Sequence, residues 1–314
     1  MSFFNLKGSF VKIRIWIPLL SIYLIWGSTY LAIRFAVETI PPFLMAATRF
    51  LIPGIILFVW RNFAGDPKPS IKEWKSTIII GLLLLVGGNG GVTWAEQYLP
   101  SGIAALVIGS VPLWIILLNL FRPEGRQLKK SVIIGTIIGF FGIAFLIGPN
   151  QLGGSSEKIH PLGIITILLA AIFWSAGSLY SHHAEMPDSP LLSTGMEFLA
   201  GGTGLLIMGM LTGEVGKVNF STITSKSILS LVYLIIFGSL IGFVAYTWLL
   251  RNAPISLVST YAYVNPLIAI LLGNLLANEP INLRILTSAA IIIGSVFLIN
   301  NAILKKKTPT EAGY

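Results

Sequence analysis

The sequence predicts an all-α integral membrane protein with ten transmembrane helices, arranged as two inverted five-helix repeats. Three observations predict this class: few charges, recurring long apolar stretches, and similarity between the two halves of the chain. Of the 314 residues, 54% are hydrophobic and 11% are charged, whereas an average soluble domain carries about 25% charged residues. The 21 Lys and Arg residues exceed the 12 acids and lie mostly in short gaps between apolar stretches. This placement indicates a lipid bilayer as partner and no nucleic acid.

The apolar stretches give the individual helices. A helix needs about 20 mostly apolar residues to cross a hydrocarbon core about 30 Å thick. Eight uncharged stretches of this kind are 15–33, 76–95, 97–121, 131–150, 162–181, 228–250, 252–278 and 285–304. Two more stretches, 43–60 and 191–212, each contain one charge, Arg49 and Glu197 respectively. Together they predict ten spans.

The distribution of basic residues predicts the orientation. Ten spans place both termini on one side, and cytoplasmic segments are enriched in Lys and Arg. With cytoplasmic termini, the inner segments hold 15 of these residues and the outer segments hold 5. We therefore expect residues 1–14 and 305–314 to be cytoplasmic segments that flank the membrane domain.

The two halves of the chain align with each other. At an offset of 148 residues, Trp26 falls on Trp174, Pro42 on Pro190 and Arg49 on Glu197. At an offset of 154, Gly88 falls on Gly242, Trp94 on Trp248 and Pro112 on Pro266. The matches predict a first repeat over 15–150 and a second over 161–304. Because each repeat has five spans, the second enters from the opposite face, and inverted repeats of this kind form a midplane binding site.

Several of these residues carry a resemblance to a known family. The run Trp26-Gly-Ser-Thr-Tyr30, the segment 94–112, and the glutamates Glu124 and Glu279 resemble the EamA-like family of the drug/metabolite transporter superfamily. The resemblance covers 15–304. It implies ten helices, cytoplasmic termini, a bacterial inner membrane, and efflux or exchange of small metabolites. A small-molecule substrate, such as an amino acid or a related solute, is therefore expected, with an exporter or exchanger working by alternating access.

Two charged residues at membrane depth are candidate functional groups, because such groups usually face a cavity or a partner. Arg49 is a candidate clamp for a substrate carboxylate, since a guanidinium presents a planar fork of donors. Its alternative role is an ion pair with Glu96. Glu197 is a candidate coupling residue, because a carboxyl in an apolar helix can exchange protons as access alternates. A neutral Glu197 bonded to a backbone carbonyl is the alternative.

Glycine and proline predict where helices deform. Gly88 and Gly90 flank Asn89 in a run of four glycines in five positions, which weakens a helix by about 1 kcal/mol per glycine relative to alanine. Pro112 and Pro266 each remove a backbone donor and permit a kink. These four residues are hinge candidates. For the glycines, tight helix packing is the alternative interpretation.

The remaining substrate-binding candidates are aromatic and small polar residues on helices expected to face the repeat axis. With Arg49, the set is Trp26, Thr29, Tyr30, Asn89, Trp94, Trp174, Ser178, Tyr246, Tyr261 and Asn265. Some of these aromatics are expected to lie in interfacial belts instead.

Other functions are weaker alternatives. His183 and Asp188 have a spacing found in lipid acyltransferases, but two fixed residues recur easily by chance. A channel is the third possibility, although no filter sequence or ring of like charges is present. We expect no catalytic residues, no cofactor and no metal, since the chain has no cysteine and His183 and its neighbours lack a complete ligand set. Nothing in the sequence indicates an oligomeric state.

Overall fold

The computed structural model describes residues 4–120, 130–147, 160–181, 183–253, 258 and 260–304. Its elements are helices, which confirms the all-α class. Seven spans in the described ranges are long and apolar enough to cross a membrane. Three shorter apolar helices, Val132–Ile147, Val264–Ala277 and Leu283–Ile299, lie where the fifth, ninth and tenth spans are expected. The number of ten crossings stays a prediction.

The bounds follow the predicted stretches closely. The first half contains α1 (Phe4–Ala36), α2 (Pro42–Phe63), α3 (Ile71–Gly81), η1 (Leu82–Gly90), α4 (Gly91–Ala95), α5 (Ser101–Ile108), α6 (Val111–Leu120) and α7 (Lys130–Ile147). The second contains α8 (Pro161–Ser181), α9 (Pro190–Leu211), η3 (Val215–Lys217), α10 (Ser225–Tyr233), η4 (Leu234–Ile241), α11 (Gly242–Asn252), α13 (Tyr261–Ala277) and α14 (Leu283–Leu304). One difference is that α1 already begins within the predicted segment 1–14. Glu124 and the tail 305–314 lie outside the described residues.

The same signals start and end the second helix of each half. Pro42 and Pro190 lie in the first turn of α2 and α9. Proline is tolerated there because backbone N–H groups in the first turn make no hydrogen bond within the helix. After the helices, Gly65 and Gly213 have φ angles of 88° and 71°. Glycine is required there because other residues rarely adopt this left-handed conformation.

The third span of each half widens into a π-helical segment. In the first half this segment is η1, which contains most of the predicted glycine run, and in the second half it is η4. A π-helical turn displaces backbone hydrogen bonds from their usual partners and often marks a functional region. The expected weakness at Gly88 and Gly90 therefore takes the form of a wide helical turn rather than a break.

Helices α2 and α9 form a close antiparallel pair. A Cβ on Gly54 would lie 3.0 Å from the backbone nitrogen of Leu199, and a Cβ on Gly202 would lie 3.0 Å from that of Leu51. These two contacts are equivalent at the offset of 148 residues. Phe50, which is fully buried, packs on its counterpart in α9 with ring centroids 5.3 Å apart.

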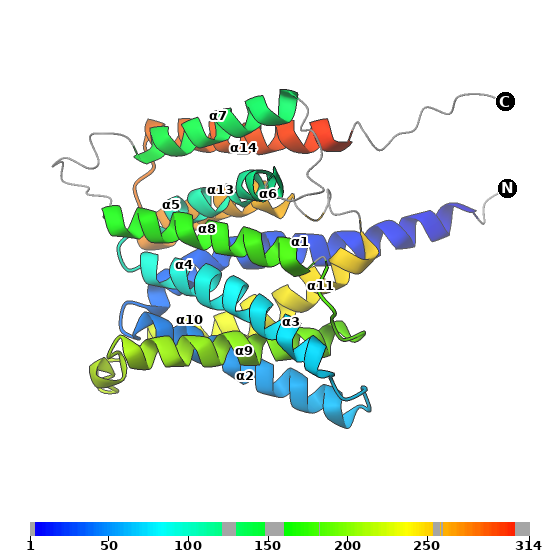
Figure 1. The fold of residues 1–314 in the computed structure, drawn as a ribbon. Helices are drawn as coiled ribbons and strands as arrows, with labels where there is room; N and C mark the ends of the chain where they lie inside the picture. Colours follow the sequence, from blue (N-terminus) through cyan, green and yellow to red (C-terminus); the bar gives the residue numbers. More distant parts are fainter. Residues whose placement is uncertain are drawn as a thin grey trace.

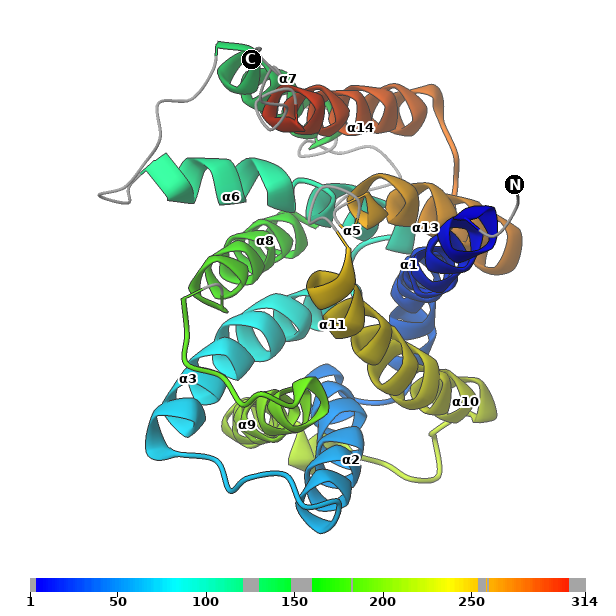
Figure 2. The same ribbon diagram turned by 90° about the vertical axis from the view of Figure 1, so that its right-hand side faces the viewer.

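The other contacts also join the two halves in matching ways. Helix α1 packs on α13 and on the α10–η4–α11 span, whereas α8 packs on α5, α6 and the α3–η1–α4 span. Helices α7 and α14 pack on each other, and Figure 1 shows them as a layer along one side of the bundle. In Figure 2 the remaining helices from both halves surround a central region. A site in that region is therefore built from both halves of the chain.

A cavity between the two halves

A cavity of about 750 Å³, including its opening, lies between the two halves. Its lining comes from α1, α2, η1, α4, α5 and α6 in the first half, and from α8, α11 and α13 in the second. The lining residues are Trp26, Thr29, Tyr30, Ile33, Arg49, Gly88, Asn89, Val92, Ala105, Ile108, Gly109, Val111, Ala170, Trp174, Phe243, Tyr261, Ala262, Asn265 and Pro266. The surface is mainly apolar with few polar groups, as in most small-molecule sites.

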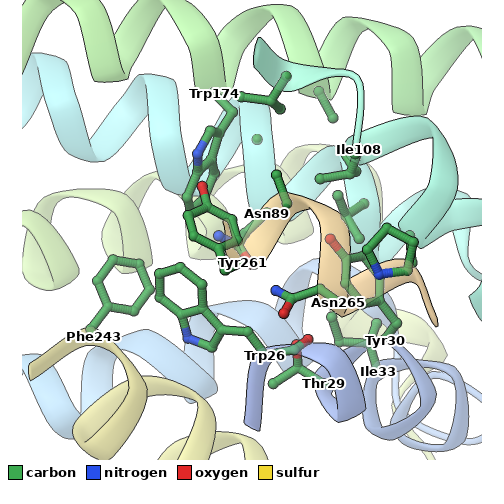
Figure 3. Close-up of a pocket in the computed structure, with 18 of the residues that line it drawn as sticks. Trp26, Thr29, Tyr30, Ile33, Asn89, Ile108, Trp174, Phe243, Tyr261 and Asn265 are labelled. Carbon is green, nitrogen blue, oxygen red and sulfur yellow. The ribbon is translucent and has the colours of Figure 1, made fainter. Parts of the chain in front are cut away.

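Aromatic rings form one side of the cavity. The Trp26 ring centroid lies 5.4 Å from those of Phe243 and Tyr261, both in edge-to-face geometry. Figure 3 shows Trp174, Tyr261 and Trp26 following one another along this side. Edge-to-face packing fixes ring orientations, so the wall presents a defined aromatic surface to a solute.

The two equivalent tryptophans contact the two third spans at equivalent places. The indole of Trp26 lies against Gly242, and that of Trp174 lies against Gly88. In addition, Trp26 Nε1 donates a hydrogen bond of 3.2 Å to the carbonyl of Gly238 in η4. The wide π-helical turns therefore accommodate the tryptophans that line the cavity.

Arg49 is the charged side chain of the lining. It is 3% exposed, and its Nε lies 3.4 Å from Ser239 Oγ. Its guanidinium lies against Gly238, where a Cβ would come within 3.2 Å of Nη2. Nη1 is buried and has no hydrogen-bond partner. An unsatisfied cationic donor in a cavity wall is suited to an anionic oxygen of a solute.

An ion pair between Arg49 and Glu96 is one of the two roles predicted for Arg49. Both carboxylate oxygens of Glu96 are buried without a hydrogen-bond partner, as is Arg49 Nη1. The two groups are close enough to interact electrostatically, but the guanidinium is directed to Ser239 and Gly238 instead. The guanidinium and the carboxylate therefore make no direct hydrogen bond to each other here, and the ion pair stays a hypothesis.

Two smaller polar residues of the lining have hydrogen-bond partners within the protein. Thr29 Oγ1 donates to the carbonyl of Trp26 at 2.7 Å. In the amide orientation that satisfies its neighbours, the Asn265 side-chain nitrogen donates to the carbonyls of Tyr261 and Tyr23 at 3.2 Å each. Asn265 thereby also ties α13 to α1. Asn89 faces the cavity from η1.

The structure brings together eight of the eleven substrate-binding candidates. They are Trp26, Thr29, Tyr30, Arg49, Asn89, Trp174, Tyr261 and Asn265. Of the other three, Tyr246 packs on Trp26 behind the wall with ring centroids 4.9 Å apart. Trp94 packs on Tyr98 at the end of the third span, and the hydroxyl of Ser178 donates to a backbone carbonyl of its own helix.

The coupling candidate Glu197 lies apart from the cavity lining. Its carboxylate accepts a hydrogen bond of 3.2 Å from Ser193 Oγ, one turn earlier in α9. It also interacts electrostatically with Tyr246. Glu197 therefore has a hydroxyl partner, rather than the backbone carbonyl considered from the sequence.

Two of the four hinge candidates line the cavity. They are Gly88, which lies in η1, and Pro266, which lies inside α13. Gly90 is covered by Leu205 of α9. Pro112 follows the interruption between α5 and α6 at Gly109 and Ser110. Whether these positions move stays a prediction.

The residues behind the alternative functions lie elsewhere. His183 and Asp188 are exposed in the connection between α8 and α9 and do not line the cavity. Among the residues that the structure describes, no group of three His, Asp or Glu side chains is arranged to hold a metal ion.

Sequence reasoning missed the apolar part of the lining. Phe243 and Val111 are examples, and no polar or charged signal marks them. The internal repeat contains the missing signal, because Phe243 is equivalent to Asn89, and Val111 to Asn265, at the offset of 154 residues.

Comparison with known proteins places the chain among transporters. The model of the EamA-like transporter family matches residues 14–148 and 161–301. The uncharacterized inner membrane transporter YedA of Escherichia coli (strain K12) is 38% identical over 283 residues, which cover 90% of this chain and 89% of YedA. The uncharacterized transporter YoaV of Bacillus subtilis (strain 168) is 24% identical, with 91% and 96% covered.

A solved crystal structure of another protein shows the same fold. It aligns with a TM-score of 0.63 and 21% sequence identity, and the alignment covers 93% of this chain and 98% of the other. At this identity the likeness concerns the fold alone.

Proposed function

The chain belongs to the EamA-like transporter family, and we propose that it moves small organic metabolites by alternating access at the cavity between its halves. Amino acids or related carboxylates are the proposed solutes, and export or exchange across a bacterial inner membrane, with both termini cytoplasmic, is the proposed activity. The observation that carries the proposal is Arg49 Nη1, a buried and unpartnered cationic donor in the wall of a cavity lined by both halves.

The antiparallel packing supports an inverted repeat. Helices α2 and α9 occupy the same place in their halves, yet their contacts pair Gly209 with Leu44 and Gly54 with Leu199, so they run in opposite directions. Helices α7 and α14 also run oppositely, with Gly135 beside Ile299 and Gly142 beside Ile291. Opposite directions are what inversion of one half relative to the other requires. The two segments that match the family model agree with repeats over 15–150 and 161–304.

The proposed movement is a rocking of helix groups about the cavity. The α2–α9 pair has close backbone contacts, which favour motion as one body. The π-helical turns and the interruption before Pro112 lie beside the cavity, where a change of helix angle opens one side and closes the other. Coupling to protons through Glu197 is the form of energy input proposed from the sequence.

A metabolite-panel efflux assay tests the proposal. Cells that overproduce the chain are loaded with a panel of amino acids and other carboxylates, and export is compared with Arg49→Gln and with Lys72→Gln. Lys72 is a matched cation whose side chain is 76% exposed outside the cavity. We expect export of at least one carboxylate by the wild type and Lys72→Gln, and its loss in Arg49→Gln. Export that persists in Arg49→Gln would exclude the carboxylate clamp.

The same cells test the acyltransferase alternative. An enzyme that uses His183 and Asp188 would leave a modified lipid, whereas a transporter leaves the lipids unchanged. We expect the lipid profile of overproducing cells to equal that of cells with an empty vector.

A further inference from the structure

A buried carboxyl group next to the cavity has no partner. Glu96 follows the last residue of the α3–η1–α4 span, and its side chain is 0% exposed. Neither carboxylate oxygen has a hydrogen-bond partner. Val92 and Asn89, which lie about one and two helical turns before Glu96 on the same span, line the cavity. The carboxyl group therefore lies at the end of a span whose preceding turns form part of the cavity wall.

The ionisable groups near Glu96 come from three neighbouring parts of the chain. Those that interact electrostatically with its carboxyl are Arg34 and Tyr30 of α1, Arg49 of α2, and Glu279, which follows α13. Of these, Arg34 and Glu279 make hydrogen bonds to backbone groups. Burial raises the pKa of Glu96 well above its usual range, and the charge of Glu279 acts in the same direction.

Two of these neighbours already have partners. Arg34 Nη1 donates to the backbone carbonyls of Glu96 and Gln97 at 2.7 and 3.2 Å, so it caps the end of α4. Its charge also acts on the Glu96 carboxyl, in the same direction as that of Arg49. Glu279 accepts hydrogen bonds from the backbone nitrogens of Ser101 and Gly102 at 2.8 and 3.1 Å. Among these groups Arg49 is the cation with an unsatisfied donor, as Glu96 is the acid with unsatisfied oxygens.

We propose that Glu96 is the proton-exchanging carboxyl of this protein and that the charge of Arg49 controls when it releases its proton. A fully buried carboxylate without partners is strongly disfavoured, and such a group takes up a proton instead. The positive charge of Arg49 favours release of that proton. A solute carboxylate on Arg49 neutralises this charge, so Glu96 keeps its proton.

The consequence is a link between solute and proton. By reciprocity, if a carboxylate on Arg49 favours proton uptake by Glu96, proton uptake favours carboxylate binding equally. One proton is then bound together with each anionic solute. This part rests on the proposed transport function, whereas the protonation of Glu96 does not. Glu197, whose carboxylate already accepts a hydrogen bond from a hydroxyl group, is less suited to the role.

Infrared spectroscopy of the reconstituted full chain tests the proposal without any solute. The carboxylic C=O stretching band of a protonated buried acid is followed as a function of pH. We expect a band that disappears in Glu96→Gln and persists in Glu185→Gln, a matched variant of an acid whose side chain is 62% exposed. A band that is the same in Glu96→Gln as in the wild type would overturn the proposal.

A second arm tests the control by Arg49. In Arg49→Gln the midpoint of the Glu96 band should move to higher pH, because the positive charge of Arg49 lowers the pKa of the carboxyl and this contribution is lost. Lys72→Gln should leave the midpoint in place. A midpoint that stays or falls in Arg49→Gln would contradict the link.

A second variant at Glu96 covers the case in which Glu96→Gln does not fold. If Glu96→Gln does not yield folded protein by gel filtration, Glu96→Asp replaces it, and its band must change in frequency; an unchanged band overturns the assignment. The infrared result is independent of flux. A failed efflux assay therefore leaves the proton site standing, and a missing band leaves the transport function standing.

Discussion

Gly54 of α2 and Leu199 of α9 meet so closely that a Cβ on the glycine would lie 3.0 Å from the leucine backbone nitrogen. The equivalent pair, Gly202 and Leu51, meets at the same 3.0 Å. Backbone atoms cannot move out of the way by a rotamer change, as side-chain atoms can. These two contacts therefore fix the separation of α2 and α9.

Larger side chains in place of these glycines should lower the stability of the protein. For Gly54→Val and Gly202→Val we expect destabilisation of about 1–3 kcal/mol each, the usual effect of overpacking. Thermal unfolding of the detergent-solubilised protein, followed by loss of the monodisperse gel-filtration peak, measures the change. Gly216→Ala is the control, because nothing lies within 4 Å of a Cβ there. Equal unfolding temperatures for all four proteins would show that α2 and α9 are not held by these contacts.

The charge and the shape of Arg49 should both matter for transport. Loss of a charge-assisted hydrogen bond costs about 1.5–3 kcal/mol, so Arg49→Gln should weaken the apparent affinity for an exported carboxylate about 10- to 100-fold. The apparent affinity of Arg49→Lys should lie between those of the wild type and Arg49→Gln, since lysine keeps the positive charge but lacks the planar guanidinium. Concentration dependence of export in everted vesicles measures this. An unaltered affinity in Arg49→Gln would remove Arg49 from the site.

Glu279 should stabilise the start of α5. Its carboxylate accepts from the backbone nitrogens of Ser101 and Gly102 and from Ser101 Oγ. Glu279→Ala leaves these donors without their acceptor, and we expect destabilisation of about 1–3 kcal/mol. Ser101→Ala removes only the hydroxyl bond and should have a smaller effect in the same thermal assay. A larger effect for Ser101→Ala than for Glu279→Ala would contradict the capping role.

Two acidic residues at equivalent positions link α2 and α9 by hydrogen bonds, one at each end of the helix pair. Asp66, after α2, accepts from Arg61 Nε at 2.8 Å and from Ser189, which precedes α9. Glu214, after α9, accepts from the backbone nitrogens of Phe43 and Leu44 in the first turn of α2, at 3.3 and 3.0 Å. The Arg61 hydrogen bond lowers the pKa of Asp66, whereas burial raises the pKa of Glu214.

Because the pKa values of Asp66 and Glu214 are shifted in opposite directions, their contributions to stability change with pH in opposite directions. A lowered pKa stabilises the folded protein above the unfolded pKa, and this contribution is lost as pH falls through the folded pKa. Asp66→Asn should therefore be less stable than the wild type near neutral pH, with a difference that shrinks below about pH 4. A raised pKa means that the folded state binds the proton more tightly, so the wild type gains stability relative to Glu214→Gln as pH falls. Thermal unfolding across this pH range checks both signs. The same direction of change for both variants would contradict the assigned causes.

The apolar stretches predicted the helices well, because burial in lipid or protein requires long uninterrupted apolar segments. The wide turn in η4 was not predicted. Its sequence contains one glycine, Gly238, whose carbonyl accepts a hydrogen bond from Trp26, more than two hundred residues earlier. Such a tertiary cause has no local signal.

Much of the cavity followed from polar and aromatic residues on the first helix of each half. Phe243 was missed because an apolar residue in a membrane helix carries no signal unless it is aligned with its equivalent, Asn89. The absence of an Arg49–Glu96 bond was not foreseeable either, since the direction of a guanidinium depends on contacts such as the one with Gly238.

Cysteine labelling from the two faces of the membrane tests the inverted arrangement of the halves most directly. Lys68 and Gly216 are equivalent at the offset of 148, both are exposed, and the chain has no cysteine of its own. In Lys68→Cys and Gly216→Cys, labelled by a membrane-impermeant maleimide, we expect Gly216→Cys to react from outside intact spheroplasts. Lys68→Cys should react only in inside-out vesicles. Reaction of both cysteines from the same face would contradict opposed halves around a shared cavity.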